Sequence, residues 1–240
     1  MAGPQCCSNP PTLDPSAGAG HVVHLGGLST YVAGSPDSKL AVLFISDGFG
    51  YEAPNLRKIA DEAAATGFYA VVPDFMHGDP FAFDKPDRPI PVWLKDHSTY
   101  KGFEEAKTII EAIKCQGVSA VGAVGYCWGA KVVAELSKYE HLIKAGVSLH
   151  PAWVTVGDIK EAKVPTAILG TEIDDFAPPE LLKQFEDVLN AKPGVDSYVK
   201  VFPKTEHGWT IRYNVEDERA VKSAKEASQI LLDWCVKHVK

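Results

Sequence analysis

Short apolar runs alternate along the chain with longer segments in which apolar residues recur every three or four positions. A continuous run such as LAVLFIS is typical of a strand buried on both faces of a parallel sheet. Gly26-Gly27 separates the first two runs and favours a tight hairpin turn, so we expect those two strands to be antiparallel. The predicted strands are His21–Leu25, Leu28–Ala33, Leu40–Ser46, Phe68–Pro73, Ala120–Val124, Ala145–Leu149, Thr166–Gly170 and Tyr198–Phe202.

The segments between the strands follow the helical period. Helices that alternate with strands predict an α/β domain, with a mostly parallel eight-stranded sheet and helices on both of its faces. We place this single domain at residues 21–240, after a flexible N-terminal segment at 1–20 that is rich in Pro, Ser, Gly and Ala. The apolar stripes fall at Leu56–Ala63, Phe103–Ile113, Ala130–Leu136, Leu181–Leu189 and Ala220–Cys235.

The stretch Asp74–His97 shows neither the apolar run of a strand nor the apolar period of a helix, and it is rich in Pro, Asp and aromatic residues. A loop of this length in a compact domain is usually functional or mobile, and its length alone makes it a candidate lid.

Composition narrows the classes of partner. Lys and Arg number 24 and Asp and Glu number 31, which gives a net charge of −7 without a basic run, so nucleic acid is not an expected partner. We expect no membrane partner, because no apolar run reaches the ~18 residues of a membrane span. The N-terminus lacks the basic and apolar regions of a signal peptide, so the expected compartment is cytoplasmic.

Five cysteines without a Cys-x-x-Cys pair are expected to be thiols in that compartment. Cys6 and Cys7 are adjacent and lack a second pair of ligands nearby. This favours a disordered or surface-packed tail over a metal or redox site.

Gly125-Tyr126-Cys127-Trp128-Gly129 follows the fifth predicted strand and fits the pattern G-x-nucleophile-x-G. A nucleophile at this position sits on a tight strand-to-helix turn, where side chains at the flanking positions would collide with neighbouring elements. The start of the next helix favours a thiolate at Cys127, and the N–H of Trp128 is placed to donate to an oxyanion. The alternative is a buried cysteine in an ordinary turn.

An acid and a histidine follow the last two strands in the order that this kind of elbow requires. His207 is the candidate general base, because among the eight histidines it alone lies just past the final strand with a glycine after it. The acid that orients its imidazole is Asp174, with Asp175 and then Glu172 as the alternatives. The second oxyanion donor is expected in the loop after the third strand, at Gly48.

Together these segments resemble the dienelactone hydrolase family of α/β-hydrolases. The resemblance is carried by the elbow GYCWG, the acid loop GTEIDDFAPPE and the segment FPKTEHGW, and it extends from about Gly26 to the C-terminus. The N-terminal QCCSNPP is similar to plant members of that family.

The resemblance implies an α/β-hydrolase fold, a Cys-Asp-His triad, no metal and no organic cofactor. It favours Asp174, because family members have a proline four residues after the triad acid, as Pro178 is here. It implies a carboxylate near the resting thiol, a place that Asp47 takes where the bacterial enzymes have Glu. It also implies arginines that bind a substrate carboxylate, for which Arg212 and then Arg88 are candidates, with a solvated surface arginine as the alternative for both.

Aromatic residues are frequent around these motifs, and we expect Phe49, Trp93 and Trp209 to line the substrate site. The expected activity is hydrolysis of a small-molecule ester or lactone through a thioester at Cys127, by a monomer or homodimer. One alternative is a β-glucan hydrolase, as some plant relatives are named, although that chemistry needs two carboxylates flanking the glycosidic bond. The other is a catalytically silent ligand-binding protein on the same fold.

Overall fold

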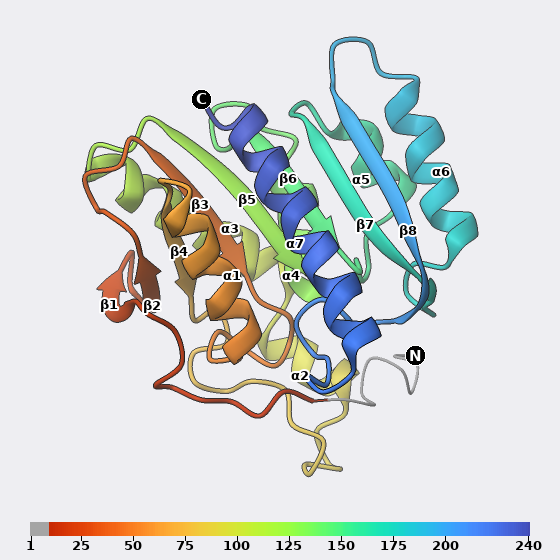
Figure 1. Cartoon of the computed structure of the whole chain (residues 1–240), viewed down its shortest axis with the longest axis horizontal. Coiled ribbons are helices and arrows are strands. Elements are labelled where there is room, and N and C mark those ends of the chain that lie inside the picture. The colour runs from red at the N-terminus through yellow and green to blue at the C-terminus, as the bar shows by residue number, and fades with distance from the viewer. Residues whose placement is uncertain (1–9) are drawn as a thin grey trace.

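The structure, a computed structural model, describes residues 10–240, so Cys6 and Cys7 lie outside the described residues. These residues form one eight-stranded sheet in the order β1-β2-β4-β3-β5-β6-β7-β8 (Figure 1). The pairs β1–β2 and β2–β4 are antiparallel and the others are parallel. The strands are β1 (His21–Leu25), β2 (Leu28–Ala33), β3 (Leu40–Ile45), β4 (Tyr69–Pro73), β5 (Ala120–Tyr126), β6 (Ala145–Leu149), β7 (Thr166–Ile173) and β8 (Ser197–Glu206).

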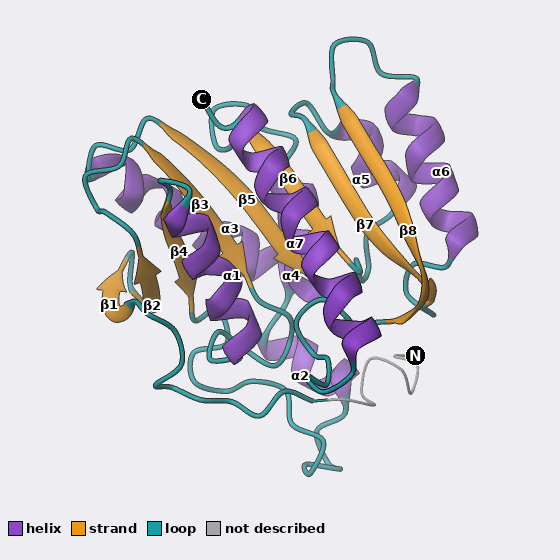
Figure 2. Ribbon diagram, viewed as in Figure 1, coloured by secondary structure: helices purple, strands orange, loops and turns teal. Residues whose placement is uncertain are grey.

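Helices cover both faces of this sheet, as the alternation predicts (Figure 2). On one face, α1 and α7 pack on alternate residues of the central strands, such as Val147 and Leu169. On the other face, α3 and α4 pack on residues such as Val121, and α5 and α6 pack around Ile168. The helices are α1 (Pro54–Ala65), α2 (Ile90–Asp96), α3 (Thr99–Cys115), α4 (Trp128–Leu136), α5 (Val156–Glu161), α6 (Pro179–Asn190) and α7 (Glu218–His238).

The structure differs from the prediction in the last two strands and in two short helices. Both β7 and β8 run past Gly170 and Phe202, where we expected them to end, and reach Ile173 and Glu206. The stretch Asp74–His97 is not wholly irregular, because it contains α2. The six-residue α5 also lacks a counterpart in the prediction, since so short a helix shows no period.

Part of the N-terminal segment contacts the domain. The N–H of Asp14 donates to the carbonyl of Glu52 at 3.1 Å, and the N–H of Ala19 donates to the carboxylate of Asp61 at 2.8 Å. The buried Arg57 donates to the carbonyl of Pro15 at 2.7 Å. The boundary at residue 20 stays a prediction.

Among the helices of residues 10–240, none combines the length and the apolar character that crossing a membrane requires.

The carboxyl ends of β3, β5, β6, β7 and β8 lie along one edge of the sheet, because these strands are parallel. In open α/β sheets this edge is where ligands bind. Asp47, Cys127, His150, Asp174 and His207 all follow these strand ends within two residues.

Candidate active site

Cys127 sits in a strained turn between β5 and α4. Its backbone has φ 50° and ψ −107°, which costs a non-glycine residue about 1–3 kcal/mol. The strand end of β6 fixes this conformation: the N–H of Cys127 donates to Leu149 at 3.1 Å, and its carbonyl accepts from Ala152 at 3.2 Å. The side chain is buried, with only 3% of the residue exposed.

The two glycines of the motif are required by close approach, as we predicted. A Cβ at Gly125 would lie 2.2 Å from the carbonyl oxygen of Gly129, and a Cβ at Gly129 would lie 2.2 Å from that of Ile45. Real Cβ atoms do not approach backbone this closely, so neither position admits a side chain without moving the turn.

The backbone N–H and the indole of Trp128 face different parts of the molecule. It is the first residue of α4, so its N–H has no acceptor within the helix and remains for another group. The indole points away into the core, where Nε1 donates to the carbonyl of His97 at 2.9 Å. The ring also lies against Gly102 of α3, where a Cβ would meet it at 2.3 Å.

Asp174, the preferred acid, contacts His207. Its Oδ2 lies 2.8 Å from Nδ1 of His207, with both side chains wholly buried. Its Oδ1 accepts from the N–H of Phe176 at 2.8 Å, which fixes the carboxylate. Asp175 is exposed, and Glu172 accepts from the N–H of Lys204 at 2.6 Å instead.

The extended ends of β7 and β8 place these two residues side by side. Thr171 and Thr205 are buried between the strands, and their hydroxyl oxygens are hydrogen-bonded at 2.8 Å. The hydroxyl of Thr171 also donates to the carbonyl of Thr205. Because this threonine pair holds the strands together beyond the apolar run, Asp174 and His207 leave the sheet at the same level.

Asp47 and Arg212 form a buried ion pair. Nε of Arg212 lies 3.0 Å from Oδ2 of Asp47, and each side chain is 1% exposed. The guanidinium also lies 4.8 Å from the ring centroid of Phe49. The interpretation of Arg212 as a solvated surface residue is therefore wrong. Removing one member of such a buried pair typically costs 3–5 kcal/mol, because the other charge loses its partner.

Arg88, the second arginine candidate, belongs to a cluster within the segment 74–97. Its guanidinium donates to Asp79 at 2.6 Å and to Asp96 at 3.0 Å. His97 contacts the same Asp79 carboxylate through Nε2 at 3.0 Å.

Gly48 lies against two aromatic side chains of this segment. A Cβ at Gly48 would be 3.4 Å from the ring of Trp93 and 3.7 Å from Cβ of Phe81. The carbonyl of Gly48 accepts from the N–H of Phe81 at 2.7 Å. The segment 74–97 therefore supports the loop that carries the expected second oxyanion donor.

The three aromatic residues expected at the substrate site lie in different surroundings. Phe49 packs edge-on against Phe81, with ring centroids 6.0 Å apart. Trp93 is 2% exposed, donates through Nε1 to the carbonyl of Asp79 and stacks on His97 at 4.6 Å. Trp209 packs on Phe202 at 4.3 Å.

Two aromatic residues that we did not single out contact the site. The half-buried Phe176 packs against the cluster of Cys127 and Ala152, and its ring centroid lies 5.1 Å from that of His207. His150 is wholly buried, with its ring centroid 5.0 Å from that of His207. Phe176 follows Asp174 by two positions, which was a usable signal, whereas His150 in sequence is indistinguishable from a core residue.

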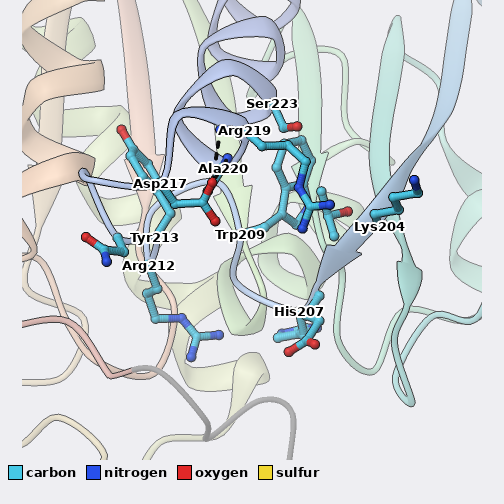
Figure 3. Close-up of a pocket in the computed structure, with 12 residues that line it drawn as sticks. Lys204, His207, Trp209, Arg212, Tyr213, Asp217, Arg219, Ala220 and Ser223 are labelled. Carbon is cyan, nitrogen blue, oxygen red and sulfur yellow. Dashed lines mark hydrogen bonds between the residues drawn. The ribbon is translucent and has the colours of Figure 1, made fainter.

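A pocket of about 280 Å³ lies between His207 and the first turn of α7 (Figure 3). Trp209 and Arg212 line it together with His207, so a single turn after β8 supplies three of its lining residues. Arg219 and Ser223 of α7 form another part of its wall.

Comparison with known proteins places the chain in a family. The model of the dienelactone hydrolase family matches residues 28–238. A Zea mays protein named endo-1,3;1,4-beta-D-glucanase is 44% identical over 195 residues, which cover 78% of this chain but only 62% of that protein. The carboxymethylenebutenolidase homolog of Mus musculus is 31% identical over 226 residues, 92% of each chain.

The fold is shared with a solved structure, the putative dienelactone hydrolase of Klebsiella pneumoniae. Its TM-score is 0.70 at 18% identity, and the match covers 88% of this chain and 93% of that one. The expected α/β-hydrolase fold is thus confirmed. The family match spans all the strands from β2 onward and every residue of the candidate site, and the chain therefore belongs to the dienelactone hydrolase family and is a hydrolase.

Proposed function

We propose that this hydrolase cleaves carboxylic esters or lactones, with Cys127 as nucleophile, His207 as general base and Asp174 as the group that orients His207. The observation that carries the proposal is the buried 2.8 Å hydrogen bond from Nδ1 of His207 to the carboxylate of Asp174. It leaves Nε2 as the ring atom that exchanges protons, at the same sheet edge as the strained Cys127 turn. Phe176 packs both against the ring of His207 and against the cluster of Cys127 and Ala152, which supports a shared site.

The reaction balances with these three residues and water. His207 takes the thiol proton, and the Cys127 thiolate attacks the carbonyl carbon to form a C–S bond. The tetrahedral intermediate then breaks its C–O bond, and His207 gives its proton to the leaving alkoxide. His207 next takes a proton from water, whose oxygen attacks the thioester, and loss of the thiolate releases the acid. Asp174 stabilises the imidazolium in each half-reaction.

Two backbone N–H groups are proposed to hold the developing oxyanion. The N–H of Trp128 is unused by α4 because of its position at the start of that helix. The N–H of Gly48 is the second donor, in a loop supported by Trp93 and Phe81. Donors of this kind typically contribute about 3–4 kcal/mol each to the transition state.

Arg212 is proposed to bind a carboxylate of the substrate. It lines the pocket beside His207, and its present partner is the carboxylate of Asp47 at 3.0 Å. A substrate carboxylate would offer the guanidinium the same charge and geometry. Asp47 is proposed as the carboxylate that lies near the Cys127 thiol before substrate binds. The cytoplasmic compartment, a plant-type relationship and the monomer or homodimer stay predictions.

A β-glucan hydrolase is the second candidate, because the maize relative carries a glucanase name. Glycoside hydrolysis uses two carboxylates that flank the scissile bond. In this site the carboxylate of Asp174 is committed to His207, and that of Asp47 to Arg212. Because both carboxylates are paired with other side chains, the site favours acyl transfer over glycoside hydrolysis.

A substrate panel on the wild-type chain and Cys127→Ala tests the proposal. It contains a p-nitrophenyl ester, a simple lactone and mixed-linkage glucan. It also contains a matched pair of compounds, a lactone that bears a carboxylate and the methyl ester of that same lactone. We expect Cys127→Ala to lower acyl turnover by roughly 10³-fold or more, as removal of a nucleophile does. The wild type is expected to prefer the lactone carboxylate over its methyl ester.

Cys115→Ala is the matched control, since Cys115 is an exposed cysteine at the end of α3. It should retain wild-type turnover. Acyl turnover that survives in Cys127→Ala would refute the nucleophile. Release of reducing sugar from glucan, without acyl turnover, would favour the glucanase, and inactivity on the whole panel would favour a silent ligand-binding protein.

A further inference from the structure

We propose that His150 is a positioning residue for His207, a buried imidazole that fixes the tilt of the general base and the turn that carries it. The inference rests on the proposed function, in which His207 transfers protons. It assigns a role to a buried histidine outside the Cys127, Asp174 and His207 set.

His150 is held in an unusual backbone conformation directly after β6. Its φ is 37°, a left-handed value that residues other than glycine rarely adopt. Its N–H continues the sheet by donating to the carbonyl of Leu169 on β7 at 2.8 Å. The residue is 0% exposed, so its imidazole has one fixed place in the molecule.

From this place the imidazole contacts both the ring of His207 and the turn that follows it. The two rings meet edge to face, with centroids 5.0 Å apart and planes at 69°. Nε2 of His150 is hydrogen-bonded to Oγ1 of the buried Thr210 at 2.8 Å. Thr210 lies in the turn closed by the carbonyl of Gly208, which accepts from the N–H of Arg212 at 2.9 Å.

These contacts supply a restraint that Asp174 alone does not. A single hydrogen bond at Nδ1 holds that atom near Asp174, but it restricts rotation of the ring about Cβ–Cγ only in part. The ring of His150, at 69°, and the ring of Phe176, at 49°, restrict this rotation through packing. The plane of His207, and with it the direction of Nε2, is then set by three neighbours.

The charge state of His150 suits a neighbour of a general base. Burial lowers the pKa of His150 well below its usual range, and the charges of His207 and Arg212 lower it further. The ring of Tyr126, 6.0 Å away, also faces it and carries a phenol whose pKa burial raises. His150 therefore stays neutral near pH 7, so it does not repel the imidazolium that forms on His207 during the reaction.

Thr210→Val tests the hydrogen bond with little change of side-chain shape, and His150→Gln tests the ring contact. We expect Thr210→Val to lower kcat by about 10-fold and His150→Gln by about 100-fold, with KM changed less than about twofold, as loss of alignment typically does. The pH profile of kcat/KM should also shift. Thr210→Ser, which keeps the hydroxyl, should restore both quantities. Thr30→Val is the matched control, because Thr30 is equally buried but lies on β2.

A proton resonance supplies a second measurement that needs no substrate. The His207 Nδ1 proton, hydrogen-bonded to Asp174, is expected far downfield in the wild type and in Thr30→Val, and shifted or broadened in Thr210→Val and His150→Gln. Lower melting temperatures with unchanged kcat, pH profile and resonance would show that His150 only stabilises the fold, and would overturn the proposal. If the wild type turns over no ester or lactone, the proposed function fails, and the resonance alone decides the role of His150.

Discussion

At the scale of single residues, the site depends on backbone that few side chains adopt. Cys127 and His150 both have positive φ angles, at the ends of neighbouring strands β5 and β6. Each is held by hydrogen bonds from the next strand along the sheet, Leu149 for Cys127 and Leu169 for His150. The rigid sheet thus maintains strain that an isolated turn would release.

The glycines beside Cys127 give a direct test of this strain. Gly125→Ala and Gly129→Ala each place a Cβ 2.2 Å from a backbone oxygen, so the turn must move. We expect each variant to lose at least about 2–3 kcal/mol of unfolding free energy or fail to fold, by the overpacking mechanism. Urea unfolding measures the loss.

The matched control is Gly157→Ala in α5, where a Cβ would meet only Oγ1 of Thr155 at 3.5 Å. Alanine at a helical position costs less conformational entropy than glycine, so this variant should be neutral or slightly more stable. A Gly125→Ala chain as stable as the wild type would contradict the argument.

Sequence identified most of the candidate residues but not their contacts. The order Cys127, Asp174, His207 could be predicted because each follows a strand that is visible as an apolar run. The preference for Asp174 over Asp175 was strengthened by the family resemblance, since adjacent carboxylates in one loop look alike. His150 could not be found, because a buried histidine after a strand carries no pattern that separates packing from chemistry.

At the scale of elements, the apolar pattern predicted the long helices and missed the short ones. The stripes of α3 and α7 predicted these helices, because their apolar residues repeat over several turns. The seven residues of α2 and the six of α5 contain less than two full periods. The last residues of β7 and β8 are mostly polar in sequence, yet Thr171 and Thr205 are buried by pairing with each other.

The short helix α5 is fixed by charge at its start. Thr155 and Asp158 form a capping box, with the Asp158 carboxylate accepting from the N–H of Thr155 at 2.8 Å. The same carboxylate lies 2.7 Å from Nζ of Lys131 on α4. Burial raises the pKa of Asp158, but Lys131 and Thr155 outweigh it and lower the pKa to about 2.

Asp158→Asn should therefore destabilise the chain near neutral pH. The lowered pKa stabilises the folded state above pH 3.8, the usual value, and this contribution is lost as the pH falls toward 2. Solvent screening reduces it to about 1–2 kcal/mol. Urea unfolding should show this difference from wild type at pH 7 and a smaller one at pH 3. Asp187→Asn, which removes an exposed ion pair with Lys183, is the control, and an equal loss at both pH values would contradict the assignment.

At the scale of the whole molecule, the sheet was predictable and the packing of the segment 74–97 was not. Parallel strands that alternate with helices predict a sheet with ligands at the carboxyl ends of its strands. The position of the segment 74–97 depends on contacts between distant residues, such as the carbonyl of His97 with the indole of Trp128. Such pairs have no periodic signature in the chain.

The charged cluster of Arg88 is expected to hold this segment in place. Hydrogen bonds from Arg88 lower the pKa of Asp79, with His97 contributing less. Arg88→Gln should speed limited cleavage by chymotrypsin at Phe81 and Phe83 several-fold. The free energy of global unfolding should change by less than about 1 kcal/mol, because the ion pairs of Arg88 are partly exposed. Lys183→Gln, on α6, is the control and should leave the cleavage rate unchanged. An unchanged cleavage rate in Arg88→Gln would show that the cluster does not hold the segment.

The indole of Trp128 fixes the place where the segment 74–97 ends. Its N–H donates to the carbonyl of His97, one residue before the N-cap of α3, so the chain must bring a carbonyl back to this place. Residues 82–87 can thus be replaced, or their number changed, while the turn of Cys127 keeps its shape, provided that this carbonyl returns and that Phe81 and Trp93 still contact Gly48. Sequence changes in the middle of the segment therefore need not disturb the turn that carries Cys127.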